Sequence, residues 1–390
     1  MKKKICVITG SRADYGLLRP LIKKIEMSCF FDLQLVVTGS HISKKHGNTI
    51  SEVEEDNFFI NDIVKNTIIS DSPVGISKSI AKGIDGFSIT LNRLKPDLVF
   101  ILGDRYEIFA ACITAFILGI PIAHHSGGEL TEGAFDDSIR HSITKMANIH
   151  FVSALEYKKR VVQLGENPKN VFVVGGFGVE NINQIRPLDQ IDLEKKINYK
   201  FSTKNLILTF HSETLDINNT IKNFSELIAA IDLNKEIGII FTLPNADTYN
   251  LEIIKMINNY VKTRTNVIVV KSLGTNNYLS ALQYVDGVIG NSSSGICEVP
   301  SFKIGSINVG IRQQGRLKAK SVIDCIPNRY KIDEAIKKLY SDKFQEKIKD
   351  VINPYDKGVT SDLVLKILKN SFIKIKTQKK FFDIDFNLNE

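Results

Sequence analysis

Hydrophobic and polar residues follow one another along this chain in blocks that predict strands, each followed by a helix. Short apolar runs rich in β-branched residues predict buried strands, and longer stretches with apolar residues at helical spacing predict the helices. The strands predicted in the first half are Lys4 to Thr9, Leu33 to Val37, Asp97 to Leu102, Pro121 to His124, Ile149 to Val152 and Val171 to Val174. The helices predicted there are Leu17 to Met27, Ile76 to Leu94, Tyr106 to Leu118, a stretch that carries Arg140 and Lys145, and Ala154 to Leu164.

The same alternation starts again after residues 179–204, which contain Pro187 and many charges and are interpreted as a linker. The strands predicted in the second half are Asn205 to Phe210, Ile237 to Leu243, Val267 to Val270, Val285 to Ile289 and Ser306 to Val309. The helices are Ile217 to Ile231, Tyr249 to Lys262, Asn276 to Tyr284, Asp333 to Val351 and Ser361 to Ile375. Strands that alternate with helices at this spacing predict βαβ units and parallel sheets, so the expected class is α/β.

The expected architecture is two Rossmann-like domains that face each other across a central cleft. The domains are 1–178 and 205–355, with the last helix, in 361–376, as a candidate to pack back on the first domain and 377–390 as a surface tail. Parallel sheets bind ligands at the carboxyl ends of their strands. The polar turns around Arg12, Asp104 and Glu129 all follow predicted strands, so they are expected at that edge.

The stretch from Gly290 to Pro300 is expected to be a strand-to-helix turn. Three consecutive serines, Ser292 to Ser294, stand between glycines there, and such a turn can present N–H and O–H groups to an anion at a helix N-terminus. Glu298 follows one helical turn later, where it can accept hydrogen bonds from a sugar diol. The alternative is an ordinary serine N-cap followed by a solvated glutamate.

Asp104, Glu129, Asp136 and Asp137 are acids at two neighbouring strand ends and in the loop that follows. Carboxylates that share a cleft raise one another's pKa, and a general acid or base that works near neutral pH needs such a shift. The alternative for each acid is solvation or an ion pair with Arg105 or Arg140. In the same way, Arg12 beside Ser11 can grip a phosphate or be an ordinary surface arginine.

Other candidate chemistries find little support in the spacing of residues. The first turn lacks the G-x-G-x-x-G pattern of dinucleotide sites, and His124, His125 and His141 lack the spacing of a metal site. Cys297 stands among apolar residues and is expected to be a packed thiol, and the serines lack the context of a hydrolase nucleophile. His211, at a strand end of the second half, can donate a hydrogen bond to a phosphate or a proton to a leaving group.

Composition and charge further limit the class of protein that this chain can be. The 390 residues fit two domains of about 150 to 200 residues each, and 43% hydrophobic with 24% charged residues is typical of a globular protein. The net charge is +8, but the lysines are spread along the chain, which favours attraction of phosphorylated small molecules over nucleic-acid binding. The odd number of widely spaced cysteines predicts reduced thiols in the cytoplasm, and no apolar run is long enough for a signal peptide or a membrane span. The cysteines are Cys6, Cys29, Cys112, Cys297 and Cys325.

Taken together, these motifs resemble those of the hydrolysing UDP-N-acetylglucosamine 2-epimerases of sialic-acid and capsule biosynthesis, the bacterial NeuC type. The matching stretches span nearly the whole chain. They are Gly10 to Gly16, Gly103 to Glu107, Gly127 to Glu129, Asp136 to His141 with Thr144 to Met146, Glu156 to Arg160, Asn245 to Asp247, Gly290 to Glu298, Arg312 with Gln313, and Gly315 with Arg316.

The resemblance implies a GT-B-like fold, a nucleotide-sugar substrate, and neither a metal nor another cofactor. It also implies a homo-oligomer, dimer or tetramer, with no nucleic-acid or membrane partner. UDP-GlcNAc would lose its C2 proton and its UDP to give 2-acetamidoglucal, and water would then add to give N-acetylmannosamine. The catalytic residues it implies are Asp104, Glu129, Asp136 and His211. The substrate-binding residues are Arg12, Arg105, Asn245, Ser292, Ser293, Glu298 and Arg312.

Three alternatives stay open. A 2-epimerase for a UDP-2,4-diacetamido-2,4,6-trideoxyhexose, which feeds legionaminic acid synthesis, would differ only at C4 and C6 of the sugar. A GT-B glycosyltransferase would share the fold and the nucleotide grip but would need an acceptor. A non-catalytic UDP-sugar sensor would have no need for three acids at the strand ends.

Overall fold

The computed structural model describes residues 2–43, 49–66, 72–132, 134–213, 217–244, 250–372, 375 and 377–385. The chain splits into two compact units. Unit 1 comprises 1–129, 136–180 and 355–390, and unit 2 comprises 130–135 and 181–354. Each unit has one parallel sheet with helices, so the predicted α/β class is confirmed.

Unit 1 is built on a seven-stranded sheet with the order β3-β2-β1-β4-β5-β6-β7. The strands are β1 (Lys3–Thr9), β2 (Phe31–Thr38), β3 (Ile60–Val64), β4 (Leu98–Leu102), β5 (Ile122–His125), β6 (Ile149–Val152) and β7 (Val171–Val173). The helices are α1 (Arg12–Glu26), α2 (Ile50–Glu55), α3 (Pro73–Leu94), α4 (Tyr106–Ile117), α5 (Asp136–Met146), α6 (Leu155–Gln163) and α15 (Thr360–Ser371). Short 3₁₀ turns are η1 (Gly39–Ile42) and η3 (Pro168–Asn170).

Unit 2 has a six-stranded sheet with the order β10-β9-β8-β11-β12-β13. The strands are β8 (Asn205–Thr209), β9 (Gly238–Thr242), β10 (Val267–Val270), β11 (Gly287–Gly290), β12 (Gly305–Val309) and β13 (Val322–Cys325). The helices are α8 (Gln190–Ile197), α9 (Ile217–Asp232), α10 (Asn250–Val261), α11 (Gly274–Ala281), α12 (Ser294–Cys297), α13 (Arg329–Leu339) and α14 (Asp342–Ile348), with the 3₁₀ turn η4 (Val299–Phe302). The chain passes from unit 1 to unit 2 within α7 (Phe177–Gln184).

Both sheets are wound in the same way. The first strand of each lies beside the fourth, so β1 pairs with β4 and β8 pairs with β11, all in parallel. The direction of winding reverses at that pair, and the crevice outside the carboxyl ends of such a pair is where open α/β sheets bind ligands. The turns after β1, β4, β8 and β11 are therefore the places to look for a site.

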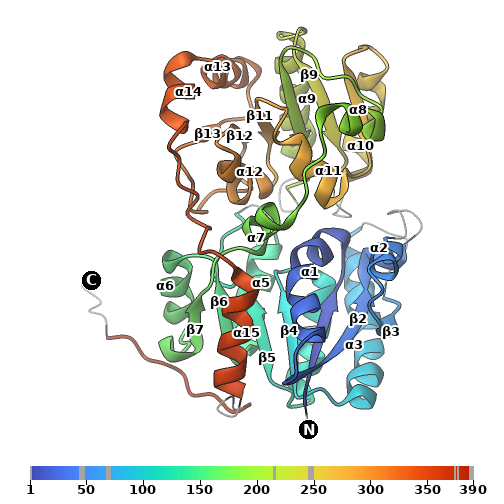
Figure 1. Ribbon diagram of the computed structural model, residues 1–390, viewed down its shortest axis with the longest axis vertical. Coiled ribbons are helices and arrows are strands. Elements are labelled where there is room, and N and C mark those ends of the chain that lie inside the picture. Colours follow the sequence, from blue (N-terminus) through green and yellow to red (C-terminus); the bar gives the residue numbers. More distant parts are fainter. Residues whose placement is uncertain are drawn as a thin grey trace. The chain divides into compact units, whose positions relative to one another are not determined.

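Each sheet is covered by apolar side chains on both faces, which is why its inner strands are mostly apolar rather than alternating. In unit 1 one face packs on α1 and α15, and the other on α3, α4 and α5. In unit 2 one face packs on α9, α10, α13 and α14, and the other on α8 and α11. Helices on the two faces of the unit 1 sheet are visible in Figure 1.

The end of the chain belongs to unit 1. The Glu180 carboxylate accepts a hydrogen bond of 2.7 Å from the backbone N–H of Ser361, and Thr360 Oγ1 donates to the carbonyl of Val174 at 3.0 Å. These bonds fix the start of α15 (red in Figure 1), which packs against α1. Farther on, the mostly exposed segment 377–385 is anchored where Phe382 N–H donates to the Gly165 carbonyl at 2.8 Å.

Several sequence-based boundaries differ from the structure. The stretch interpreted as a linker contains most of α7 and all of α8, whose residues Leu193 and Ile197 are part of the unit 2 core. The predicted helix from Asp333 to Val351 is two helices, α13 and α14, because Ser341 starts a new helix by accepting from Phe344 N–H. Strands β3 and β13 are additional.

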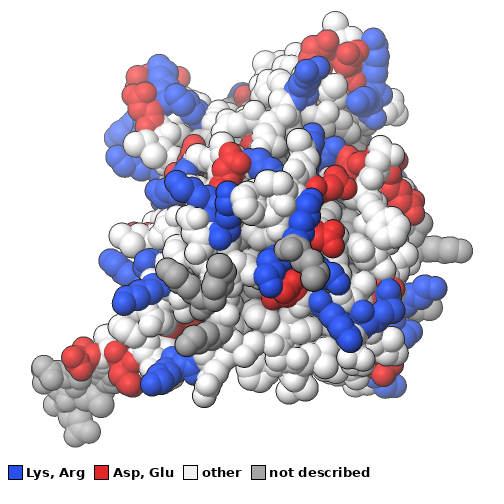
Figure 2. Space-filling model, turned by 60° about the horizontal axis from the view of Figure 1, so that its bottom comes forward, with Lys and Arg blue, Asp and Glu red and all other residues white. Residues whose placement is uncertain are grey.

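Charged side chains are mixed by sign on the molecular face in Figure 2. Lysines and arginines lie among aspartates and glutamates there rather than in one continuous basic stripe. No helix in the described part of the chain is long and apolar enough to cross a bilayer.

Candidate functional site

In unit 1 the predicted residues lie at the carboxyl ends of β1, β4 and β5, around the point where the winding reverses. Arg12 is the first residue of α1, and Ser11 caps this helix by accepting from Asp14 N–H at 3.2 Å. The Arg12 guanidinium forms an ion pair with Glu52 of α2. The predicted phosphate ligand is therefore held by a carboxylate in this structure.

The central arrangement of unit 1 joins Asp104, Glu129 and the buried Arg140 of α5. One nitrogen of the guanidinium donates to the Asp104 carboxylate, and another donates to the backbone carbonyl of Glu129 at 2.7 Å. The Glu129 side chain is 5% exposed and accepts from Ser153 Oγ at 3.0 Å. Two of the predicted catalytic acids are thus fixed by one arginine, which sequence reasoning treated only as a possible ion-pair partner.

Asp136 and Asp137 begin α5, where the helix dipole favours negative charge. The Asp137 carboxylate lies 3.7 Å from Arg140 and 3.5 Å from the imidazole of His141. Burial lowers the pKa of His141, and the charge of Asp137 opposes that shift. Asp137 therefore stands next to the arginine that holds Asp104 and Glu129, and Asp136 precedes it at the start of the helix.

Sequence reasoning missed the role of Glu107, which explains the glycine of the first turn. Glu107 is fully buried, and its Oε1 accepts from Arg105 Nε at 2.9 Å. A Cβ on Gly10 would lie 2.4 Å from Glu107 Cγ, and one on Gly39 would lie 3.0 Å from the same atom. The glycines leave room for this carboxylate, and Arg105, a predicted substrate ligand, is held by it.

Asp14 is a second acid that the sequence did not single out. One oxygen of its carboxylate is buried and has no hydrogen-bond partner among the described residues. Burial raises its pKa to about 6, while Arg105 lowers it and Glu107 raises it further. A raised carboxyl pKa beside a strand end is typical of a functional group. The signal in the sequence was its place two residues after Arg12.

His124 and His125 are structural. His124 Nε2 donates to the Gly103 carbonyl at 2.8 Å, and His125 Nε2 donates to the Gly175 carbonyl at 3.1 Å. Burial lowers the pKa of His124 to about 3 and that of His125 to about 4, so both rings are neutral at physiological pH. Among residues outside the gaps given above, no three His, Cys, Asp or Glu side chains form a group that could hold a metal ion.

In unit 2 the fully buried Asn291 connects the ends of β8 and β11. Its side chain accepts from His211 N–H at 2.7 Å and donates to the His211 carbonyl at 2.9 Å, while its own N–H donates to Thr209 at 3.1 Å. Gly290 must be a glycine, since its φ is +135° and a Cβ there would lie 1.9 Å from the Thr209 carbonyl oxygen. His211, a predicted catalytic residue, is placed by this contact.

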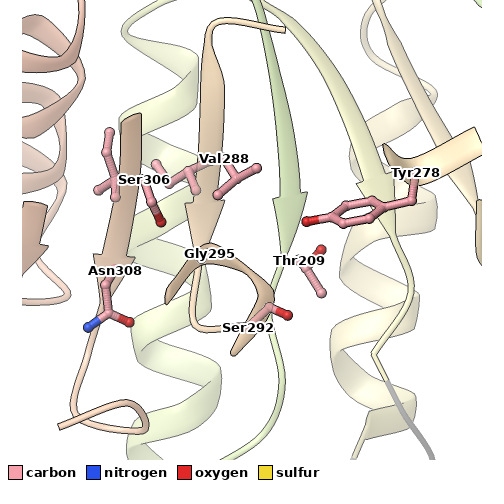
Figure 3. A pocket seen from close by; sticks show the side chains of 10 residues that line it. Thr209, Tyr278, Val288, Ser292, Gly295, Ser306 and Asn308 are labelled. Carbon is pink, nitrogen blue, oxygen red and sulfur yellow. The ribbon is translucent and has the colours of Figure 1, made fainter. Parts of the chain in front are cut away.

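The loop that carries Ser292 to Ser294, called the serine loop below, leads from β11 into a helix, as predicted. The helix that follows, α12, has a single turn, and Ser293 before it makes no side-chain capping bond. One turn aligns few peptide dipoles, so the binding of an anion at this helix N-terminus stays a prediction. The loop still presents hydroxyl groups: Ser292 lines a small pocket with Thr209, Tyr278 and Ser306 (Figure 3).

Glu298 and Arg312 lie close to this loop. Burial raises the pKa of Glu298, against a hydrogen bond from Ser294 and the charge of Arg316, which lower it. Arg312 Nη1 donates to the Asn291 carbonyl at 3.2 Å, so it belongs to the same cluster as Gly290 and His211. The predicted ligand Asn245 lies outside the described residues.

Comparison with known proteins assigns the family. Residues 23–369 match the family model described as UDP-N-acetylglucosamine 2-epimerase. The chain belongs to this family. It is 39% identical over 385 residues to the GDP/UDP-N,N'-diacetylbacillosamine 2-epimerase (hydrolyzing) of Campylobacter jejuni, covering 98% of this chain and 100% of the relative. It is 38% identical over 385 residues to the polysialic acid biosynthesis protein P7 of Escherichia coli, covering 98% of each.

Solved structures of other epimerases have the same fold. A UDP-GlcNAc 2-epimerase from Neisseria meningitidis bound to UDP-GlcNAc matches with a TM-score of 0.78 at 16% identity, covering 94% of this chain and 100% of that one. The expected GT-B-like fold, with two Rossmann-like units, is confirmed at this level. The UDP-N-acetylglucosamine 2-epimerase family assignment makes this chain a hydrolysing 2-epimerase of a nucleotide sugar. The two relatives are named for different sugars.

Proposed function

We propose that this family member converts UDP-GlcNAc and water into N-acetylmannosamine and UDP. The C2–H bond and the C1–O bond to UDP break first, which forms the C1=C2 double bond of 2-acetamidoglucal and releases UDP. The oxygen of water then bonds to C1 and a proton returns to C2 from the opposite face. The reaction requires a base, an acid and a site for the leaving diphosphate. It requires neither a metal nor another cofactor.

The observation that carries this proposal is the arrangement of Asp104, Arg140 and Glu129. The C2 proton is weakly acidic, so the base must be held in place and protected from bulk water. Glu129 is 5% exposed and is fixed at its side chain by Ser153 and at its backbone by Arg140. The same guanidinium holds Asp104. Two acids that one buried cation fixes, Asp104 through its carboxylate and Glu129 through its backbone, are suited to removing a proton and returning one.

The remaining roles are those that the resemblance to the family implies. Asp136, at the start of α5, is the third candidate for acid and base, and His211 would assist the departure of UDP. The nucleotide would be held by residues that carry hydroxyl, amide, carboxylate or guanidinium groups. These are Arg12, Arg105, Asn245, Ser292, Ser293, Glu298 and Arg312.

The C. jejuni relative supports a second candidate substrate. Its name refers to N,N'-diacetylbacillosamine, a 2,4-diacetamido-2,4,6-trideoxyhexose, and it is as similar to the chain as the E. coli protein is. The nucleotide-linked form of this sugar differs from UDP-GlcNAc only at C4 and C6. The elimination at C1 and C2 would be the same, so the proposed residue roles hold for both substrates.

A single substitution tests the assignment of the base. We expect Glu129→Gln to abolish turnover of both sugars while the affinity for UDP, measured by calorimetry, stays within about threefold of the unchanged protein. The matched control is Glu156→Gln on the exposed surface of α6, which should leave turnover unchanged. Loss of UDP affinity in Glu129→Gln, or turnover near that of the unchanged protein, would contradict the role of Glu129.

A further inference from the structure

The two acids Glu129 and Asp136 flank, in sequence, a short segment that belongs to the other unit. Both acids are part of unit 1, whereas Leu130–Phe135 is part of unit 2. Any displacement of this segment therefore acts on both acids through the chain itself. What holds the segment is consequently relevant to the chemistry.

The segment is held by Arg316, from the loop after β12. Arg316 Nε donates to the Leu130 carbonyl at 2.9 Å, and Nη2 lies 3.4 Å from Thr131 Oγ1. Thr131 is 3% exposed, and its carbonyl accepts from Ala134 N–H at 3.2 Å, which closes a turn. The guanidinium thus bonds to a backbone carbonyl and contacts a side chain of a tight, largely buried turn.

The backbone beside Arg316 is shaped for this contact. Gly315 has a φ of +77°, which strongly favours glycine. A Cβ at Gly315 would lie 2.4 Å from Leu130 Cδ1, so a larger residue would displace Leu130. Residues 315 and 316 are therefore fitted to Leu130 and Thr131 by shape as well as by hydrogen bonds.

The other side of the same guanidinium faces the serine loop. Arg316 Nη1 lies 3.8 Å from Cys297 Sγ, at the end of α12. The positive charge of Arg316 also lowers the pKa of the neighbouring Glu298, against the effect of burial. Arg316 therefore stands between the candidate ribose ligand Glu298 and the segment that links the two acids.

We propose that Arg316 is a positioning residue. It holds Leu130 and Thr131 against the serine loop and thereby fixes the positions of Glu129 and Asp136 when the nucleotide is bound. This inference rests on the proposed function. A ribose diol that engages Glu298 would act on the loop around residues 297 and 298, and Arg316 connects this loop to the backbone of Leu130. Arg316 itself makes no contact with the reacting atoms.

The first test separates catalysis from binding. We expect Arg316→Gln to lower kcat about 100-fold, because a misplacement of about 1 Å in a catalytic group has an effect of this size, with UDP affinity within threefold of the unchanged protein. The kcat of Arg316→Lys should lie between those of the unchanged protein and Arg316→Gln, since lysine keeps the charge but not the planar, forked guanidinium group. The matched control is Arg329→Gln, in which the arginine lost is an exposed partner of Glu226 in the same unit.

The second test reads the position of the segment without activity. In the unchanged protein UDP should slow hydrogen exchange at the amides of Leu130, Thr131 and Ala134, and in Arg316→Gln this protection should disappear while UDP still binds. Arg316→Lys, the variant closer to the native chemistry, provides the same comparison if Arg316→Gln fails to fold.

Three outcomes overturn the inference. The first is unchanged kcat in both Arg316 variants, and the second is UDP protection at these amides that persists in Arg316→Gln. The third is a loss of UDP affinity in step with the loss of kcat, which would make Arg316 a nucleotide ligand. A failure of the proposed function is distinct from these, because the unchanged protein would then neither bind UDP nor turn over either sugar.

Discussion

Replacing Asp14 by asparagine should make the protein more stable at neutral pH. Asp14 is the third residue of α1, and one of its carboxylate oxygens is buried without a hydrogen-bond partner among the described residues. Asparagine has the same shape and carries no charge. The change therefore removes a buried charge together with its attraction to Arg105 and its repulsion by Glu107.

The size of the effect follows from the pKa. An aspartate in an unfolded chain titrates near 3.9, and burial raises the pKa of Asp14 to about 6. The native state then binds more protons than the unfolded state between about pH 4 and pH 6, so its stability falls as the pH rises through this window. Above it the ionised carboxylate costs up to about 3 kcal/mol, at about 1.4 kcal/mol for each pKa unit.

The assay is urea denaturation followed by circular dichroism at pH 4.5 and pH 7.5. A chain with two units can unfold in more than one step, so transition midpoints are compared rather than extrapolated free energies. Asp14→Asn should raise the midpoint at pH 7.5 and have much less effect at pH 4.5. The matched control is Asp192→Asn, at the same position of α8, where the side chain is 59% exposed.

The reasoning is refuted if Asp14→Asn is no more stable than the unchanged protein at pH 7.5. It is also refuted if Asp192→Asn gives the same gain. A more stable but less active Asp14→Asn would indicate that the buried acid is kept for function at a cost in stability.

Two further predictions concern contacts that tie distant parts of unit 1 together. Gly10→Ala should lower the free energy of unfolding by about 1–3 kcal/mol, because the added Cβ would lie 2.4 Å from Glu107 Cγ. The control is Gly176→Ala, whose Cβ would lie 3.7 Å from its nearest neighbour. Equal urea midpoints for the two variants would contradict the account. Lys379→Met should lower the free energy of unfolding by about 1–3 kcal/mol. The reason is that Lys379 Nζ lies 2.8 Å from both Glu166 carboxylate oxygens and 2.7 Å from the Ala147 carbonyl. The exposed Lys380→Met is its control in the same denaturation assay, and a similar loss in both variants would show that the bonds of Lys379 are unimportant.

Much of the fold could be predicted because its strands are buried on both faces. Such strands appear as short, continuous apolar runs, as in β4, where all five residues from Leu98 to Leu102 are buried. The two strands that were not predicted, β3 and β13, are sheet edges. Edge strands expose part of their surface, and Ile60–Val64 accordingly contains Asn61 and Asp62. The apolar pattern is too weak there to indicate a strand.

The candidate site could be predicted only as far as the strand ends. The polar turns after β1, β4, β8 and β11 follow from the alternation, but the contacts between them depend on which strands lie side by side. Glu107 against Gly10 requires β1 next to β4, and Asn291 against His211 requires β11 next to β8. The linker prediction failed for a similar reason, since the charges of α8 hide the apolar residues Leu193 and Ile197 on its inner side.

The measurement that tests the proposed reaction most directly is NMR of the protein incubated with UDP-GlcNAc in deuterated water. The account predicts free UDP together with N-acetylmannosamine that carries deuterium at C2, because the proton removed in the elimination is replaced from solvent in the hydration. UDP-GlcNAc that stays intact would contradict UDP-GlcNAc as substrate, and the UDP-linked diacetamido sugar would be tested next. Release of UDP with N-acetylglucosamine that carries hydrogen at C2 would contradict the elimination itself.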